Sequence, residues 1–310
     1  MSIRLEDFPN ELSLNIFKYV DTRDLFYGFW QLNQRFNQLL QSLKKHILII
    51  EKSESKLISI FGCQIYKVIV DTCLDINFMK FSYLHSLVLY DITETHLTQI
   101  RTKFMPYLDY LSIPSNNQSW WTYRLIERIF SPELSSLTTV NLGYFPIFKP
   151  SHSYSDYLHS MTVYCNSPFI VFDILRLCPN LSYLRVRFHH IHNRYFPMLS
   201  STIHHSLKYF ILLDSSSILS FNHIDTLLQY IPNVERIRLN FKCDVPFIRL
   251  AQMISNRLSY LYEFNCYIDI LSEDDDDDII NLEIIRQIHP CFHHIQCNID
   301  DFGCRTYITN

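Results

Sequence analysis

The residues best suited to chemistry lie near the C-terminus, where histidines and cysteines are dense. They are His289, Cys291, His293, His294, Cys297 and Cys304. Thiolate and imidazole are ligands that zinc prefers, but zinc sites usually take two ligands from one tight turn, as in C-x-x-C, and that spacing is absent. The pair Ile295 and Cys297 instead fits a last strand. We therefore predict no metal site and expect these residues in the core and on the surface of a terminal unit.

Other enzyme signatures are also missing from the sequence. The four glycines, Gly28, Gly62, Gly143 and Gly303, are isolated. Phosphate-binding loops need clustered glycines, because their backbone N–H groups must approach the ligand closely. Neither a G-x-S-x-G nor an H-E-x-x-H string is present. We expect a non-catalytic chain that binds no cofactor.

Two adjacent tryptophans, Trp120 and Trp121, follow a polar segment of the chain. One interpretation is core packing at the start of the next helix. The other is exposure as anchors for a partner, since tryptophan is enriched among the residues that dominate binding energy. Four tyrosines near the expected strands are further candidates for a target-binding surface: Tyr90, Tyr144, Tyr164 and Tyr183.

Acidic residues concentrate in one run, Glu273 followed by Asp274–Asp278. Such a run is typical of a solvated, self-repelling loop, and a docking patch for a basic partner is the alternative. A calcium site is disfavoured because the alternating ligand spacing is absent. The run contributes −6 to the net charge of −4, so the rest of the chain is close to neutral. Lys and Arg form no evident cluster, and we expect no nucleic-acid partner.

Composition indicates a globular protein. With 48% hydrophobic residues, the 310-residue chain can bury a large core. No run approaches the roughly 18 apolar residues of a membrane span. The N-terminus has no apolar signal core, so we expect neither membrane insertion nor secretion. The nine cysteines are scattered, mostly within apolar patterns, which favours reduced, buried thiols in the cytoplasm or nucleus.

The elements that would position these residues repeat along the chain. An L-x-x-L pattern of apolar residues occurs eight times, at intervals of 23 to 27 residues, and most copies continue with one more alternating apolar residue. This alternation predicts short, half-buried strands. The copies start at Leu84, Leu108, Leu134, Leu158, Leu181, Leu207, Val234 and Leu258.

Between several strands the pattern becomes helical. Apolar residues at i, i+3, i+4 spacing predict helices over 97–104, 125–130 and 224–231. Alternation over 65–70 and 292–297 predicts a degenerate first strand and a last strand. One strand and one helix per period of about 20–29 residues resembles leucine-rich repeats, over roughly residues 55–300.

The leucine-rich-repeat resemblance implies a fold and a role. In that family stacked units form a curved solenoid with parallel strands on the concave face and helices on the convex face. The repeats would bind a target protein. The asparagine that follows the strand in that family is mostly missing here, so an even curve is not implied.

The N-terminus carries a second motif. Leu12, Ile16 and Val20 recur every four residues, so a helix places them on one face. This apolar stripe is wider than a small helical unit can bury by itself, and we expect it to need a partner surface. The string resembles an F-box over about residues 4–45, with Phe8 and Val20 in place of the usual leucines. The late tryptophan of that family has no equivalent. The matching positions are Phe8-Pro9, Glu11-Leu12, Ile16-Phe17, Tyr19-Val20, Asp24-Leu25, Leu32 and Phe36.

Together the two resemblances imply a substrate receptor of an SCF-type ubiquitin ligase. In that family the F-box docks on a Skp-type adaptor, which joins it to a cullin–RING scaffold, and the receptor acts only by positioning its target. The alternative is a leucine-rich-repeat scaffold not coupled to ubiquitination, in which the N-terminal stripe packs on the repeats. The residues implied for adaptor binding are Phe8, Pro9, Leu12, Ile16, Phe17, Leu25, Leu32 and Phe36.

We therefore predict an α/β fold with two parts. A helical F-box occupies residues 1–48, and a polar joint follows at 49–60. A leucine-rich-repeat-like domain spans 61–310 and carries an acidic insertion at 273–278.

Overall fold

The computed structural model describes most of the chain. The described residues are 5–43, 46–50, 55–71, 75–114, 120–145, 154–188, 206–271, 281–300 and 304–309. The chain divides into two compact units, Met1–Thr138 and Thr139–Asn310, and each is described by itself. Within the described ranges, no helix combines the length and apolar character needed to cross a membrane. The acidic run Asp274–Asp278 lies outside the described residues.

The first unit begins with a small helical head (residues 5–43). Asp21 and Asn33 each cap the helix that follows them, because their side chains accept hydrogen bonds from backbone N–H groups in the first turn. These caps set the two helix starts after the turns. The elements of the head are the 3-10 helix Leu5–Asp7, α1 (Asn10–Phe17), α2 (Thr22–Phe29) and α3 (Gln34–Ser42).

A parallel four-stranded segment of sheet follows in the first unit, in the order β1-β2-β3-β4. Its strands are β1 (His46–Ile50), β2 (Ile65–Val70), β3 (Ser86–Leu89) and β4 (Tyr110–Ile113). Its α-helices are α4 (Ser55–Phe61), α5 (Glu94–Gln99) and α6 (Trp120–Ile129). The segment 49–60, expected as a polar joint, thus contains the end of β1 and most of α4.

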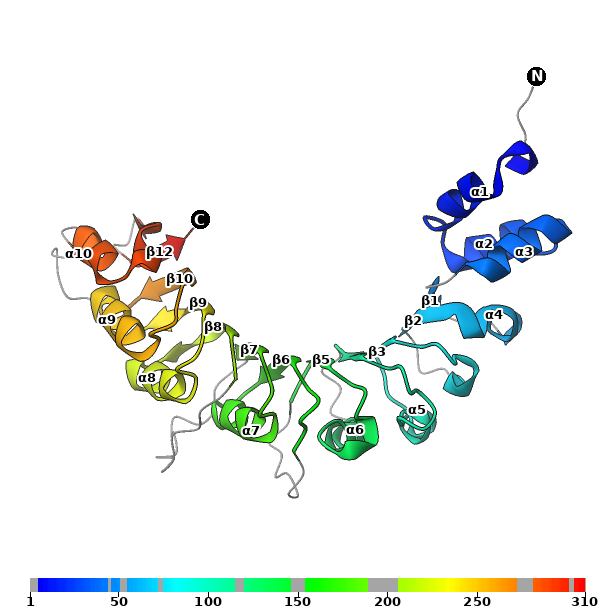
Figure 1. The fold of residues 1–310 in the computed structure, drawn as a ribbon. Coiled ribbons are helices and arrows are strands. Elements are labelled where there is room, and N and C mark those ends of the chain that lie inside the picture. The colour runs from blue at the N-terminus through cyan, green and yellow to red at the C-terminus, as the bar shows by residue number, and fades with distance from the viewer. Residues whose placement is uncertain are drawn as a thin grey trace. The chain divides into compact units, whose positions relative to one another are not determined.

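The second unit has more strands, with its helices on one face of the sheet (Figure 1). Its parallel strands are β5 (Thr139–Leu142), β6 (Ser160–Cys165), β7 (Tyr183–Phe188), β8 (Tyr209–Leu219), β9 (Arg236–Cys243) and β10 (Glu263–Ile270). They are followed by β11 (Ile295–Ile299) and β12 (Arg305–Thr309). Its α-helices are α7 (Phe169–Leu177), α8 (Phe221–Tyr230), α9 (Phe247–Arg257) and α10 (Asn281–Ile288).

The expectation of an entirely parallel sheet is wrong at the C-terminal edge. The strand expected at 292–297 is present as β11, but it does not pair with β10. Instead β12 lies between them and pairs antiparallel with both. Antiparallel neighbours need only a short turn, whereas another parallel strand would need a long crossover connection. The hairpin therefore closes this edge with few residues.

The sequence repeats explain the core of each unit. The first residue of every L-x-x-L copy precedes its strand and is at most 2% exposed. In β6, β7 and β9 the alternating apolar residues that follow are buried, so each of these strands buries one face. Backbone bonds at the strand starts hold the register. For example, the N–H of Tyr110 donates to the carbonyl of His85 and that of Arg236 to the carbonyl of Lys208, both at 3.0 Å.

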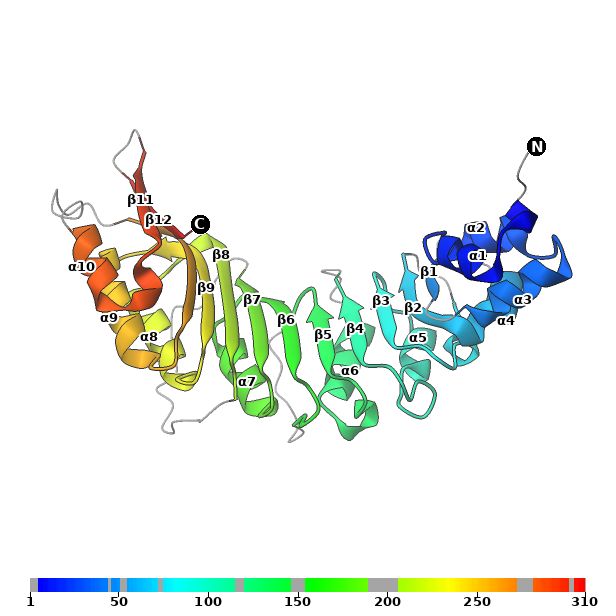
Figure 2. The same cartoon turned by 45° about the horizontal axis from the view of Figure 1, so that its top comes forward.

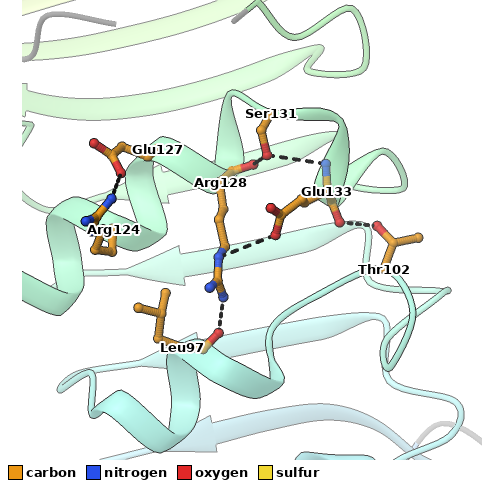
Figure 3. A network of polar contacts seen from close by, with 7 residues as sticks. All are labelled: Leu97, Thr102, Arg124, Glu127, Arg128, Ser131 and Glu133. Carbon is orange, nitrogen blue, oxygen red and sulfur yellow. Dashed lines mark hydrogen bonds and ion pairs between the residues drawn. The ribbon is translucent and has the colours of Figure 1, made fainter. Parts of the chain in front are cut away.

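Side chains tie successive helices of the first unit together (Figure 3). Arg128 of α6 donates a hydrogen bond to the Leu97 carbonyl at the end of α5, and its Nε lies 3.5 Å from the Glu133 carboxylate. Thr102 donates from both its N–H (3.0 Å) and its hydroxyl (2.6 Å) to the Glu133 carbonyl. This polar network fixes the spacing of neighbouring helices on the side away from the strands.

Candidate functional site

The residues expected to bind an adaptor separate into two groups. Phe17, Leu25 and Phe36 are each only 1% exposed. The Phe17 ring lies 4.9 Å from that of Phe29 and 5.9 Å from that of Phe36, measured between centroids. These side chains hold the head together and cannot contact a partner directly, so the expectation for these three is corrected.

The remaining five residues are accessible. Leu12 and Leu32 are 45% and 57% exposed. Pro9 is also exposed, and Phe8 and Ile16 are half-buried. On α1, the buried face consists of Ser13 and Phe17, one residue beyond Leu12 and Ile16. Because each helical residue is turned by about 100° from the last, the Leu12–Ile16 stripe lies beside the buried face and remains outside.

Arg35 of α3 positions the segment that carries Phe8 and Pro9. Its Nε donates to the Asn10 side chain at 2.8 Å. Its other guanidinium nitrogens donate to the backbone carbonyls of Glu6 and Phe8. Sequence reasoning missed this role, since the partners lie 25 to 29 residues away and no local pattern marks them.

The head packs on the sheet through α2 rather than α1. The Thr22 hydroxyl donates to the Ile47 carbonyl of β1 at 2.6 Å. The Phe61 ring of α4 meets the rings of Phe26 and Trp30 edge-on, with centroids 6.1 and 5.3 Å away. The α1 stripe is therefore not used in holding the head to the rest of its unit.

The candidate target-binding aromatics are divided between the two units and differ in exposure. Trp120 is the first residue of α6 and is 61% exposed, with the Arg124 guanidinium 4.8 Å from its ring centroid. Trp121 is half-buried. Tyr90 follows β3 in the first unit and is 41% exposed. Tyr144, Tyr164 and Tyr183 are half-buried and belong to the second unit.

A cluster of basic side chains on the second unit was not expected from the sequence. It consists of Arg185 and Arg187 on β7 and of Arg236, Arg238 and Lys242 on β9, which we call the basic face. All five alternate with buried residues, so they lie on the sheet face opposite the helices. This corrects the expectation that Lys and Arg do not cluster. The available signal was the alternation in R-V-R and R-I-R-L-N-F-K.

The C-terminal histidines and cysteines do not assemble a ligand set. No group of three or more His, Cys, Asp or Glu side chains suited to a metal occurs among the described residues. His289 and Cys291 line a groove of about 530 Å³ together with Tyr262 and His294. The Cys291 N–H donates to His289 Nδ1 at 3.3 Å, which caps a 3-10 helix. Burial raises the pKa of the Cys291 thiol, with Glu263 adding to the effect.

The four buried cysteines, Cys165, Cys178, Cys243 and Cys266, are unsuited to nucleophilic chemistry. Burial raises the pKa of Cys243 to about 11 and that of Cys266 to about 12. It likewise raises the pKa values of Cys165 and Cys178. These thiols stay protonated at neutral pH, whereas the thiolate is the reactive form.

Comparison with known proteins identifies no family for this chain. The chain matches none of the protein-family models searched, and no curated protein matches it in sequence. What the protein does must therefore be inferred from the geometry of the exposed α1 stripe and of the basic face.

Proposed function

We propose that this protein is a substrate receptor of an SCF-type ubiquitin ligase. In this proposal the head is an F-box that docks on a Skp-type adaptor and, through it, on a cullin–RING scaffold. The strand–helix units are leucine-rich repeats in a curved solenoid that binds the target protein. The receptor contributes positioning rather than acid, base or nucleophile.

The observation that carries the proposal is the exposure of the α1 stripe while α2 holds the head in place. Leu12 is 45% exposed and Ile16 is half-buried in the free chain. A head that served only as a cap would be expected to turn this apolar stripe inward. Exposed apolar groups of this kind usually mark an interface when they are contiguous.

The energetics of such a contact are adequate. Burying one large apolar side chain contributes about 1.5–3 kcal/mol. Before ordering costs, three or four anchors among the accessible residues contribute about 4.5–12 kcal/mol, a range that includes the roughly 8 kcal/mol of a micromolar contact. The accessible residues are Phe8, Pro9, Leu12, Ile16 and Leu32.

Co-elution with a Skp-type adaptor tests the proposal. The purified chain and adaptor are mixed at micromolar concentrations and separated by size-exclusion chromatography. We expect a stable one-to-one complex. Separate elution of the two proteins under these conditions would refute adaptor binding.

The second candidate function is a repeat scaffold without a link to ubiquitination. The contacts of Phe26 and Trp30 with Phe61 favour it, because they make the head a structural cap of its unit. Under this alternative the α1 stripe has no adaptor to bind, so the same chromatography separates the two candidates.

A further inference from the structure

We propose that the basic face of the second unit binds an acidic, extended polypeptide segment, whose Asp and Glu carboxylates pair with its arginines. This inference rests on the proposed function, because it names the class of target segment that the receptor would hold. The site lies wholly within the second unit, on β7, β8 and β9, which run side by side in Figure 2.

The strand register sets the arrangement of the charges. Arg185 aligns with Ile211 of β8, which in turn aligns with Arg238 of β9. Neighbouring strands lie about 4.8 Å apart, and residues two apart on one strand are separated by roughly 6.6 Å. Two arginines on β7 and two on β9 therefore stand on either side of β8, with their backbones about 10 Å apart.

Carboxylates that pair with the five cations are missing from the described part of the chain. None of them forms an ion pair with a described residue. The acidic groups at the margins are otherwise engaged: Glu235 pairs with Lys208 at 2.6 Å, Glu263 accepts from Asn265 at 2.9 Å, and Asp269 accepts from Thr306 at 2.8 Å. Like charges this close repel one another, and a complementary anionic partner removes that repulsion.

Two of the guanidinium groups stack on aromatic rings, which orients them for binding carboxylates. Arg187 lies over the Tyr164 ring at 5.3 Å and Arg236 over the Tyr209 ring at 4.9 Å. Stacking uses the flat face of a guanidinium and leaves its N–H donors free in the plane. Those donors can form two parallel hydrogen bonds with a carboxylate.

The spacing suits an extended peptide. Alternate side chains of an extended chain repeat at roughly 6.6 Å, which matches the step from Arg185 to Arg187 and from Arg236 to Arg238. Lys242 continues the row on β9. Carboxylates distributed along a peptide can therefore meet several cations at once.

The same geometry disfavours a nucleic acid. Single-stranded nucleic acids bind by stacking bases on exposed aromatic faces. Here arginines already cover the rings of Tyr164 and Tyr209.

The experiment measures peptide binding to the full chain by fluorescence anisotropy. The probe is a labelled peptide in which glutamate alternates with serine around one central leucine, and its counterpart has glutamine at every glutamate. We expect the glutamate peptide to bind, and we expect its binding to weaken as the salt concentration rises. The double variant Arg185→Glu/Arg238→Glu should bind it about tenfold or more weakly. Equal binding of the glutamine peptide would overturn the proposal.

A matched control uses the same charge change elsewhere. Arg249 lies on α9, on the helix face of the same unit, where it stacks on Phe221. Arg249→Glu should leave peptide binding unchanged, and an equal loss in this variant would overturn the assignment of the site. Tighter binding of a single-stranded RNA, or binding only of a phosphorylated peptide, would also overturn it.

Adaptor co-elution separates this proposal from the proposed function. Arg185→Glu/Arg238→Glu should still co-elute with the Skp-type adaptor and should melt at the wild-type temperature. If wild type binds the adaptor but not the glutamate peptide, the inference about the target fails while the proposed function stands.

Discussion

Replacing Leu12 and Ile16 together by aspartate should weaken binding to a Skp-type adaptor by about a hundredfold or more. Each position loses the burial of a large apolar side chain, about 1.5–3 kcal/mol. The new carboxylates would also have to be desolvated against an apolar partner surface. At about 1.4 kcal/mol per tenfold change, the loss is measurable by titration calorimetry.

The control for this double variant is Tyr260→Asp in the second unit. Tyr260 is 64% exposed and likewise offers an apolar surface for replacement by a carboxylate. We expect unchanged adaptor binding in this variant and wild-type melting curves in both. Wild-type affinity of the double variant, or an equal loss in Tyr260→Asp, would show that the α1 stripe is not the adaptor-binding surface.

Replacing Phe36 by alanine should destabilise the head by about 3–5 kcal/mol, the range for buried Phe→Ala changes. Phe36 is 1% exposed and its ring packs 5.9 Å from those of Phe17 and Phe29. Truncation would leave a cavity where α1 and α3 meet. Denaturant unfolding followed by circular dichroism, with amide exchange of the head, measures the effect.

The matched change is Leu32→Ala, at a residue that is 57% exposed. Exposed substitutions usually change stability by less than about 0.5 kcal/mol. Leu32→Ala should therefore leave the head folded. By contrast, Phe36→Ala should lose adaptor binding because the head unfolds, and Leu12→Asp/Ile16→Asp should lose it although the head stays folded. Native amide protection of α1 and α3 in Phe36→Ala would contradict the interior role of this ring.

The repeating strands and some of the helices between them were predictable because alternation and helical spacing recur at nearly constant intervals. The exceptions have physical reasons. In β1 every residue after His46 is apolar although Ile47 and Ile49 are 49% and 38% exposed, so periodicity is hidden. Strand β12 has one buried residue, Tyr307, and too little alternation to be recognised.

The candidate sites were predictable only in part. The pattern of α1 identified Leu12 and Ile16, but the same apolar residue types serve inside and outside, so Phe17 and Phe36 were misplaced. The basic face depends on register: Arg185 and Arg238 lie level with each other on either side of β8 only because equivalent positions of successive strands align. The role of Arg35 depends on tertiary contacts that no local pattern records.

Hydrogen exchange of the whole chain, with and without a saturating Skp-type adaptor, tests the central claim most directly. We expect slower amide exchange over residues 10–17 and little change in the second unit. Unchanged exchange in the head, or protection confined to the second unit, would contradict the claim that the head is the docking module.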